Sequence, residues 1–563
     1  MTDMDRKPLR LWPGIAAIVL LFVSRFGVKI ARPDFHGFFV GTMAAFACAL
    51  LVVLWWLAFS RAVWVERLGG IVLIVAALFA TMKLGHVSMW PAALLGYVMP
   101  TLLLAFVAWA VATRYLPDGR RRLAMVATVA IVSGAWLLVR TEGVDGDHDN
   151  SFMWRWTKTA EERLLAGSGD AWTVPGRLPL DTGPSWPGFR GSARDGVVRG
   201  VRIATDWSES PPVELWRRPV GPGWSSVAVV GDRVYTQEQR GEHEVVTCYS
   251  AATGDPIWIH EDVARFYEVQ AGTGPRATPT VHDGRVYTFG GTGILNALDA
   301  LDGSRLWSRD VASDAERGLP QFGFASSPLI VNDLVIVDGG RLAAYDRVTG
   351  EPRWFGPKSN VSHSSPHLVT SDGVPQIVLL RGGGVTSVSP ADGEVLWKHS
   401  WEGFAIAQPA LTANGDVLIG ANRYGTRRLT IVRGAEGWSA EERWTSIGLK
   451  PYFNDFVVHL GSVYGFDGRI LANLDADTGE RRWKGGRYGH GQLLLLADQD
   501  LLLVLSEKGE LALVSATPDK FKELARFPAI EGKTWNHPVL VDDLLLVRNG
   551  SEMAAFRLAR EGG

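Results

Sequence analysis

The sequence has little cysteine and no excess of basic residues. Only Cys48 and Cys248 occur in 563 residues, and no Cys-x-x-Cys-His motif is present, so covalent haem c and cysteine-cluster metal sites are excluded. The 57 Lys and Arg against 59 Asp and Glu give a formal net charge of -2. A nucleic-acid-binding chain would normally carry a basic domain that neutralises phosphates, so nucleic acid is excluded as a partner.

Long apolar runs are missing from residue 141 onwards but dominate residues 1–140. A helix needs about 20 apolar residues to cross a bilayer. The sequence therefore predicts a helical transmembrane domain over 1–140. A linker rich in acidic, Gly and Pro residues follows at 141–185, with one short helical pattern at 159–165, and a second module covers 186–563.

About five spans are predicted in the first part. The runs 38–59 and 91–112 meet the length requirement, and three shorter runs lie at 11–24, 68–82 and 123–139. The first run is expected to stay uncleaved, because Arg25 and Lys29 follow it where a signal-peptidase site needs small residues. No Asp or Glu lies within these runs, which argues against a proton relay.

The distribution of Lys and Arg predicts the orientation. With the N-terminus inside, the inner segments carry nine basic residues and the outer segments five. Five spans then place everything after Arg140 outside the cytoplasm. We expect a multi-pass protein of a bacterial inner membrane, with the lipid bilayer as a partner, a cytoplasmic N-terminus and a periplasmic second module.

A phrase repeats through the second module: an apolar pair, Asp or a small residue, a turn ending in Gly, and a Trp three or four residues later. Clear copies begin at Leu298, Tyr345 and Leu474. The tryptophans are Trp216, Trp258, Trp307, Trp354, Trp397, Trp444 and Trp483, with Phe527 at the next position. Their spacing of 39 to 49 residues is that of a four-stranded propeller blade.

A second marker with the same period is a small polar pair before a strand. It occurs eight times, at 225–226, 278–279, 327–328, 365–366, 408–409, 454–455, 491–492 and 537–538. The sequence therefore predicts an all-β, eight-bladed propeller. The strand around Trp216 has no blade of its own and the last unit lacks a Trp strand, so Val213–Arg218 is expected to pair with Met553–Leu558 and close the ring.

The Asp-x-x-Thr-Gly-x-x-x-Trp phrase resembles the tryptophan-docking repeat of the pyrroloquinoline quinone (PQQ) enzyme-like propellers, which include quinoprotein alcohol dehydrogenases and BamB. The opening Trp186-Pro-Gly-Phe-Arg-Gly191, followed by Arg194-Asp-Gly196, resembles the start of many PQQ-binding-like repeat proteins. The resemblance covers about 186–558. It implies that the seven tryptophans dock between blades and have a structural role.

Five spans before a periplasmic propeller are similar to the layout of membrane-bound quinoprotein glucose dehydrogenase. The family's dehydrogenases, however, carry long insertions between blades and, in the alcohol dehydrogenases, a vicinal Cys-Cys pair, and neither is present here. PQQ chemistry needs a divalent cation held by Glu, Asn and Asp oxygens, a carboxylate base, and cations for the cofactor's carboxylates. No single stretch supplies all of these.

Loops that lead into the innermost strands concentrate aromatic and titratable residues, which converge on the axis of a propeller. Two interpretations are open: these residues satisfy backbone groups at a crowded axis, or they bind a ligand. The candidate ligand-binding residues are Arg276, His363, Lys450, Tyr452, Asn454, Tyr488, His490, Gln492, Lys533, Trp535, Asn536 and His537. Asp455 is the candidate catalytic base if the chain is an enzyme, and Asn454 with Asp455 would be the calcium ligands.

The favoured function is a membrane-anchored binding or scaffold module, with a small molecule, a peptide or an envelope protein as the ligand at the propeller axis. The alternative is a PQQ- and calcium-dependent dehydrogenase that oxidises an alcohol or sugar and passes electrons to membrane quinone. A third hypothesis makes the helices the working part. Compact blades favour the first over the second, and the lack of acidic residues in the spans disfavours the third.

Overall fold

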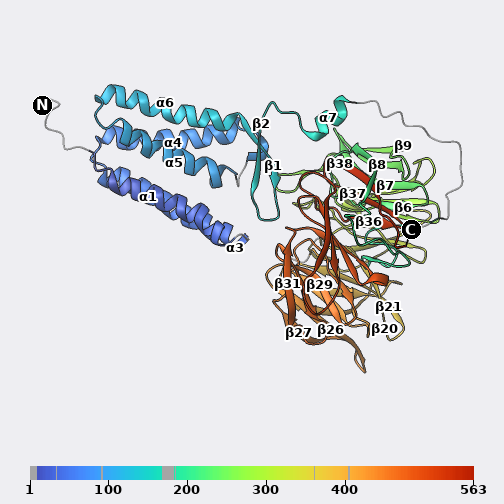
Figure 1. The fold of residues 1–563 in the computed structure, drawn as a ribbon. Coiled ribbons are helices and arrows are strands. Elements are labelled where there is room, and N and C mark those ends of the chain that lie inside the picture. The colour runs from blue at the N-terminus through green and yellow to red at the C-terminus, as the bar shows by residue number, and fades with distance from the viewer. Residues whose placement is uncertain are drawn as a thin grey trace. The chain divides into compact units, whose positions relative to one another are not determined.

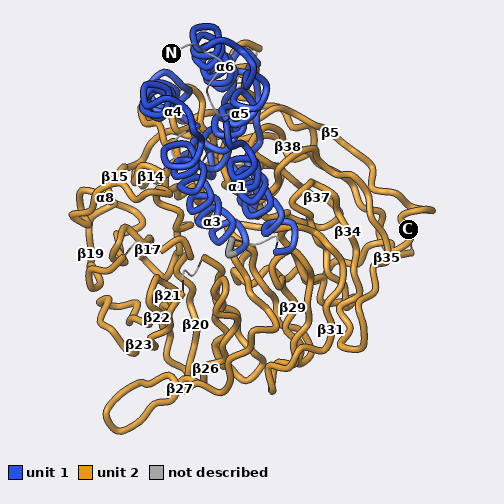
Figure 2. The backbone as a smooth tube through the Cα atoms, turned by 90° about the vertical axis from the view of Figure 1, so that its left-hand side faces the viewer, with its two compact units in different colours: residues 1–158, 269–272 blue, residues 159–268, 273–563 orange. Residues whose placement is uncertain are grey.

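The computed structural model describes residues 9–32, 35–89, 93–167, 183, 185–360, 362–403 and 406–562. It contains two compact units (Figure 2). Unit 1 comprises residues 1–158 and 269–272, and unit 2 comprises residues 159–268 and 273–563. Unit 1 is built mainly of helices and unit 2 almost entirely of strands (Figure 1).

Unit 1 holds five helical segments and a β-hairpin. The first three segments are α1 (Trp12–Phe22) continued by the π-helical turn η2 (Val23–Gly27) and α2 (Val28–Ala31), then α3 (Phe35–Leu54) with the π turn η3 (Trp55–Phe59), then α4 (Trp64–Leu84). The 3-10 turn η4 (Val87–Met89), the π turn η5 (Leu94–Val98) with α5 (Met99–Ala112), and α6 (Asp118–Leu137) follow. Strands β1 (Val139–Val144) and β2 (Asn150–Trp154) pair antiparallel.

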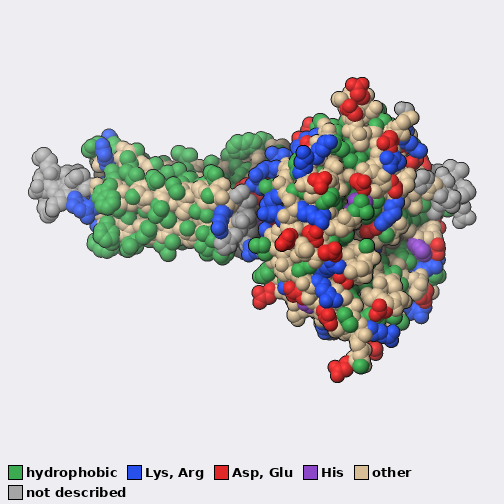
Figure 3. Space-filling model, turned by 60° about the horizontal axis from the view of Figure 1, so that its bottom comes forward, with side chains coloured by type: hydrophobic (Ala, Val, Ile, Leu, Met, Phe, Trp, Pro, Cys, Tyr) green, Lys and Arg blue, Asp and Glu red, His purple; other side chains and the backbone are tan. Residues whose placement is uncertain are grey.

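Four helical segments of the described chain are long and apolar enough to cross a membrane: Trp12–Ala31, Gly37–Phe59, Trp64–Leu84 and Leu94–Ala112. Figure 3 shows apolar side chains over much of the helical surface in view. The first and third segments are longer than the predicted apolar runs, because the helices continue through Arg25 and Glu66. The fifth predicted span corresponds to α6, whose first turns carry Asp118 and three arginines and leave a shorter apolar stretch.

The expectation that no acidic residue lies in a span is wrong for α4, which contains Glu66. Its side chain is buried and forms an ion pair with Arg121 of α6, and its second oxygen lies 3.4 Å from Arg122 Nε. A buried carboxylate is retained when a cation neutralises it. Glu66 therefore joins α4 to α6.

Unit 2 begins with α7 (Ala160–Ala166), which coincides with the predicted short helix and starts with a capping box between Thr159 and Glu162. Blades 1 to 4 follow. Blade 1 holds β6 (Ala228–Val230), β7 (Arg233–Arg240), β8 (His243–Ser250) and β9 (Pro256–Val263); blade 2 holds β12 (Thr280–His282), β13 (Arg285–Phe289), β14 (Ile294–Asp299) and β15 (Arg305–Asp310); blade 3 holds β16 (Leu329–Val331), β17 (Leu334–Asp338), β18 (Leu342–Asp346) and β19 (Pro352–Phe355); blade 4 holds β20 (His367–Ser371), β21 (Val374–Arg381), β22 (Gly383–Val388) and β23 (Val395–Trp401). Short elements β10 (Tyr267–Glu268), β11 (Gly272–Thr273) and α8 (Val311–Asp314) lie between blades in sequence.

Blades 5 to 8 complete the propeller. Blade 5 holds β24 (Ala410–Leu411), β25 (Val417–Ala421), β26 (Gly425–Gly434) and β27 (Gly437–Ser446); blade 6 holds β28 (Val457–His459), β29 (Ser462–Asp467), β30 (Ile470–Asp475) and β31 (Arg481–Arg487); blade 7 holds β32 (Gln492–Leu496), β33 (Leu501–Leu505), β34 (Glu510–Ser515) and β35 (Glu523–Pro528); blade 8 holds β36 (Val539–Val541), β37 (Leu544–Arg548), β38 (Glu552–Arg557) and β5 (Val213–Pro219). The 3-10 turn η6 (Ala497–Gln499) joins β32 to β33. The labelled sheets follow one another around a ring in Figure 2, which confirms the predicted eight-bladed propeller.

The repeated tryptophans join neighbouring blades. Each indole N–H donates to a carbonyl of the next blade in six pairs: Trp216 to Ala251 (2.9 Å), Trp258 to Ala300 (3.2 Å), Trp307 to Arg347 (3.2 Å), Trp354 to Pro390 (3.0 Å), Trp444 to Ala476 (3.1 Å) and Trp483 to Thr517 (2.8 Å). Trp397 differs, because its N–H donates to Gln376 Oε1 within its own sheet at 2.7 Å. In the following blade 5, β26 and β27 have ten residues each and pair as far as Gly434 and Gly437, so the Asp-to-Gly turn of the repeated phrase is absent between them.

The glycine of the repeated phrase makes room for the indole. A Cβ atom at Gly254 would lie 2.6 Å from the Trp216 ring, and one at Gly303 would lie 2.4 Å from the Trp258 ring. Both glycines also have φ near +74°, a conformation that L residues rarely adopt. The Asp of the phrase caps the same turn: Asp346 Oδ1 accepts the N–H groups of Val348 and Thr349, each at 2.9 Å.

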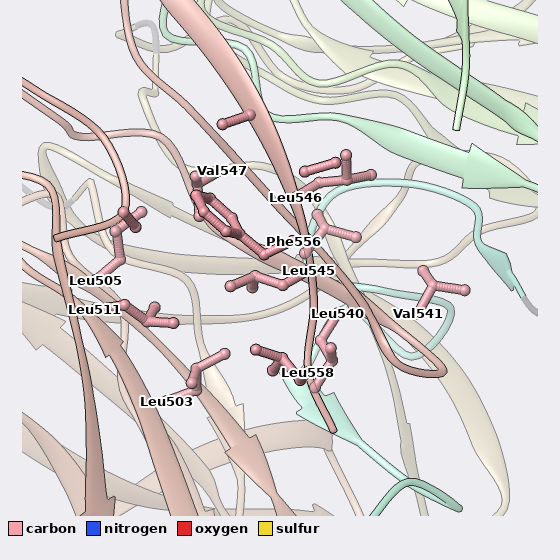
Figure 4. Close-up of a cluster of buried hydrophobic side chains, with 14 of the residues drawn as sticks. Leu503, Leu505, Leu511, Leu540, Val541, Leu545, Leu546, Val547, Phe556 and Leu558 are labelled. Atoms are coloured by element: carbon pink, nitrogen blue, oxygen red, sulfur yellow. The ribbon is translucent and has the colours of Figure 1, made fainter. Parts of the chain in front are cut away.

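The ring is closed by a strand from the start of unit 2. Strand β5 pairs antiparallel with β38, with Trp216 opposite Ala555, which is the pairing expected from the sequence. Blade 8 thus takes three strands from the C-terminal end and one from residues 213–219. A large apolar cluster forms where blades 7 and 8 meet; Figure 4 shows Leu503 and Leu511 of blade 7 near Leu545 and Phe556 of blade 8. The pairing of β5 with β38 removes strand edges that would otherwise be exposed.

Candidate functional site

A belt of hydrogen bonds surrounds the propeller axis where the innermost strands begin. Six backbone N–H groups each donate to a side chain of the next blade: Ser226 to Thr278 (3.0 Å), Thr278 to Ser327 (3.0 Å), Ser327 to Ser365 (2.9 Å), Ser365 to Gln408 (3.1 Å), Gln408 to Asp455 (2.6 Å) and Asp455 to Gln492 (3.5 Å). Gln492 Nε2 donates to the Trp535 carbonyl at 3.0 Å, and Ser226 Oγ donates to the His537 carbonyl at 2.7 Å. We call this ring the belt, and the face of the propeller on which it lies the belt face.

The belt explains the second repeated marker of the sequence. Each polar side chain in it satisfies a backbone N–H group of the preceding blade. Buried backbone donors need such partners, because an unpaired one costs about 1–3 kcal/mol. Gln492, a predicted ligand-binding residue, and Asp455, the candidate base, are therefore engaged with their own chain. His537 takes part in the belt through its backbone carbonyl.

An N-terminal segment, residues 185–198, fills the axis. We call it the axial segment. Its strand β3 (Ser185–Trp186) pairs antiparallel with β6 of blade 1, and its strand β4 (Val197–Val198) pairs in parallel with β32 of blade 7. Both partners are the first strands of their blades, so the segment adds strands on the inner side of the ring. Between them the chain reverses direction inside the propeller.

The reversal places two arginines in left-handed backbone conformations. Arg190 has φ of 60° and Arg194 has φ of 55°, values that non-glycine residues adopt rarely and at a cost. Arg190 Nη2 donates to the Phe456 carbonyl at 3.0 Å, and Arg194 donates to the carbonyls of Ser327 and Pro328 at 3.0 and 2.8 Å. The two side chains thus tie the axial segment to blades on different sides of the ring.

A charged cluster forms where Arg190 meets the belt. Arg190 Nε lies 3.4 Å from Asp455 Oδ2, and His537 Nε2 lies 3.0 Å from the same oxygen. Burial alone would raise the pKa of the Asp455 carboxyl, but the Arg190 charge and the His537 ring hold it below its usual value. Burial lowers the pKa of His537, and burial with the Arg190 charge lowers the pKa of Arg194 to about 9.

This cluster bears on the proposed role of Asp455 as a base. A general base works best when its pKa lies near the operating pH. Asp455 is 2% exposed, is paired with Arg190 and has a lowered pKa, so it is a weak proton acceptor at neutral pH. Its environment is that of an ion pair in a protein interior.

Aromatic side chains gather on the belt face beside this cluster. The Trp224 and Trp535 rings lie 4.6 Å apart, Phe453 lies 4.7 Å from Trp535, and His490 lies 5.6 Å from Phe453. Lys533 Nζ lies over both indoles, 5.3 Å from Trp224 and 4.6 Å from Trp535. Blades 1, 6, 7 and 8 contribute these residues, and we call the group the aromatic cluster.

Glu507 holds the aromatic cluster in position. One of its carboxylate oxygens accepts the Trp535 indole N–H at 2.8 Å, and the other accepts the His490 backbone N–H at 3.0 Å. Tyr452 packs edge-on to His490 at 5.9 Å. The cluster therefore combines half-buried rings, one lysine and one buried carboxylate. Of these residue types, Trp and Tyr are enriched at protein-binding hot spots.

A second group on the same face surrounds Arg276. Its guanidinium lies 4.8 Å from the Phe266 ring, and Nη1 donates to the Gly274 carbonyl at 2.6 Å. Burial lowers the pKa of Arg276 to about 10, and burial with the Arg276 charge lowers the pKa of His363 to about 4. Burial raises the pKa of the nearby Glu244 carboxyl to about 7. At neutral pH Arg276 is thus the cation of this group and His363 is neutral.

The remaining predicted ligand-binding residues contact neighbouring parts of their own chain. Lys450 forms an ion pair with Asp467 of β29, and the Tyr488 hydroxyl donates to Glu523 of β35. The Asn454 side chain accepts the Tyr452 backbone N–H at 3.0 Å, and Asn536 Nδ2 donates to the Ser225 carbonyl at 2.6 Å. The thirteen candidates therefore divide among the belt, the aromatic cluster, the Arg276 group and ordinary inter-strand contacts.

Comparisons with known proteins place the propeller in a family. A family model described as outer membrane protein assembly factor BamB matches residues 212–378 and 381–561. The chain belongs to this family. Apart from residues 269–272, the match lies within unit 2, and it includes none of the helices α1 to α6, so the family membership concerns the propeller.

The relatives include quinohemoprotein alcohol dehydrogenases and BamB proteins. Quinohemoprotein alcohol dehydrogenase ADH-IIG of Pseudomonas putida is 26% identical over 247 residues, which are 38% of this chain and 33% of the relative. BamB of Burkholderia pseudomallei is 27% identical over 34% of this chain and 48% of the relative. BamB of Xanthomonas campestris is 28% identical over 51% of this chain and 82% of the relative. The chain thus spans a third of the length of the Pseudomonas putida relative and about half of the length of the Burkholderia pseudomallei relative. The match to the solved structure of the Pseudomonas putida dehydrogenase covers 68% of this chain and 81% of the dehydrogenase chain, with a TM-score of 0.50 and 14% identity. This match shows that the two share a fold.

The dehydrogenase relatives raise the question of whether a BamB-family propeller with these residues fits PQQ and calcium. The oxygens nominated for the cation are engaged: Asp455 by Arg190 and Gln408, and Asn454 Oδ1 by Tyr452. Among the described residues no group of three or more His, Cys, Asp or Glu could hold a metal ion. The axial segment also runs through the region next to these oxygens. The residues present do not fit the cofactor at the axis.

Proposed function

We propose that this chain is a membrane-anchored periplasmic propeller that binds a segment of an envelope protein on its belt face. The observation that carries the proposal is the axial segment: the axis is filled by the protein's own Arg190 and Arg194, while the half-buried aromatic rings lie on the belt face beside it. Interface hot spots are rich in Trp, Tyr and Arg. Membership of the BamB family supports a protein partner over a small molecule.

Membrane anchoring is proposed from unit 1. Four segments are long and apolar enough to span, and α6, at 20 residues, has a length of about 30 Å. If α6 also crosses, five spans and the excess of basic residues on the N-terminal side place unit 2 in the periplasm. This location is consistent with the envelope role in the name of the BamB relatives.

The proposal is tested with a photo-reactive amino acid in the full-length chain in cells. Placed at Trp535 in the aromatic cluster, it is expected to form a discrete adduct with a partner protein. The matched control is the same amino acid at Trp438 on β27 of blade 5, which is also half-buried but lies outside the belt face. Lys533→Glu should lower the yield of the Trp535 adduct about tenfold, as expected for a hot-spot charge, whereas Lys398→Glu on exposed β23 should not.

Two results would contradict the proposal. One is the absence of protein adducts at position 535. The other is an identical set of adducts at positions 535 and 438, which would show only non-specific proximity.

A further inference from the structure

Arg25 of unit 1 is a buried cation in an unusual helical environment. It lies in the π turn η2 and is 1% exposed. A second π turn, η5, lies next to it, and Arg25 Nε donates to the Gly96 carbonyl of that turn at 3.2 Å. π turns are rare inside helices and occur frequently at functional sites. Here two of them meet at one arginine.

Three aromatic rings surround the guanidinium. Its carbon lies 5.2 Å from the Phe26 ring, 4.9 Å from the Phe38 ring and 5.2 Å from the Tyr97 ring. Cation–π contacts stabilise an arginine removed from water, but they do not neutralise its charge. Gly96 provides the space, because a Cβ atom there would lie 3.2 Å from Nη2.

One edge of the guanidinium has no partner. Nη1 and Nη2 are buried and make no hydrogen bond, and no ion pair joins Arg25 to a carboxylate in the part of the chain that the structure describes. Three other cations of unit 1 have polar partners: Arg121 pairs with Glu66, Lys29 pairs with Asp149, and Arg67 donates to the carbonyls of Ala62 and Leu57. Two parallel N–H donors form the fork that binds the two oxygens of a carboxylate or phosphate.

We propose that Arg25 binds the phosphate of an anionic phospholipid through its Nη1–Nη2 edge. The proposal rests on the membrane anchoring proposed above. The helix around Arg25 exposes apolar residues, with Val23 58% exposed and Ile30 82% exposed, as expected for a surface that faces acyl chains. An anionic phospholipid supplies a phosphate oxyanion for the guanidinium and acyl chains that can pack against the aromatic rings.

The test uses the full-length chain, purified in a neutral detergent and freed of lipid. Bound lipid is counted by native mass spectrometry after titration with phosphatidylglycerol, with phosphatidylcholine, or with inorganic phosphate. The expected result is one tightly bound phosphatidylglycerol in the wild type, with affinity at least tenfold above that for phosphatidylcholine. Arg25→Gln should weaken this binding about ten- to a hundredfold, the loss expected for charge-assisted hydrogen bonds.

Three further variants separate the site from general effects. Arg67→Gln removes another membrane-domain arginine that lies over an aromatic ring, Trp64 at 5.0 Å, and should leave lipid binding unchanged. Arg25→Lys retains the charge but not the fork and should bind several-fold more weakly than the wild type. Gly96→Ala retains Arg25 but displaces its guanidinium, and should lower affinity as Arg25→Gln does.

Equal binding of phosphatidylglycerol by the wild type, Arg25→Gln and Gly96→Ala overturns the proposal. Saturable binding of inorganic phosphate that excludes the lipid overturns the assignment to a lipid. A failure of membrane anchoring would be recognised separately, because the wild-type chain would then be released from membranes by carbonate.

Discussion

Replacing Arg190 with Gln is expected to lower the free energy of unfolding of the propeller by about 3–5 kcal/mol, because the Asp455 carboxylate would then be buried without its cation. Both side chains are almost fully buried, and Arg190 also donates to carbonyls at 2.9 and 3.0 Å. The measurement is thermal and denaturant unfolding of the full-length chain in detergent, followed by near-UV circular dichroism of the propeller's tryptophans.

The matched control is Arg199→Gln. Arg199 follows the axial segment and pairs with Asp195, but its side chain is 59% exposed, so the expected loss is below about 1 kcal/mol. Asp455→Asn should be destabilising on its own, and the double variant with Arg190→Gln should lose less than the sum of the two, because the partners are coupled. An Arg190→Gln protein that unfolds like the wild type would show that the axial segment is not anchored in the axis.

Replacing Trp216 with Ala is expected to destabilise the propeller by about 3–5 kcal/mol, the usual cost of truncating a buried aromatic residue. Trp216 is 8% exposed, donates to Ala251 and lies against Gly254, so it forms the joint between blades 8 and 1. The same unfolding measurement applies.

Trp258→Ala provides the comparison, because Trp258 makes the equivalent contacts with Ala300 and Gly303 between blades 1 and 2. If the closing joint is equivalent to the others, the two losses should agree within about 1 kcal/mol. A loss for Trp216→Ala far below that for Trp258→Ala would mean that β5 does not close the ring.

The blade architecture could be predicted from the sequence because each blade repeats local chemistry. The Asp caps a turn and the Gly adopts a left-handed φ, and the Trp packs against the corresponding Gly of the next blade. One repeated phrase therefore contains the residues for both the local turn and the contact between blades. The polar pairs were located correctly along the chain as well. The satisfaction of backbone groups was one of the two roles expected for them, and the belt shows this role. The sequence could not decide between the two roles, because it does not show which N–H groups need a partner.

The axial segment could not be predicted from the sequence. Arg190 contacts Phe456, 266 residues away, and such a contact has no periodic signal. The available sign was two arginines, Arg190 and Arg194, in a loop that also contains Gly188, Gly191 and Gly196. The predicted lengths of the first and third membrane helices were also too short. An apolar run ends at a charged residue, whereas these helices continue through Arg25 and Glu66, which are buried.

The most direct test of the central claim, that the filled axis makes this propeller a binding module, is a titration of the purified full-length chain with PQQ and Ca²⁺. Absorbance and retention of the cofactor after gel filtration are measured, followed by dye reduction with alcohols and sugars. We predict no retained cofactor and no substrate-dependent dye reduction, with Arg190→Gln measured beside the wild type. Stoichiometric retention of PQQ by the wild type, with turnover of an alcohol or sugar, would contradict the account.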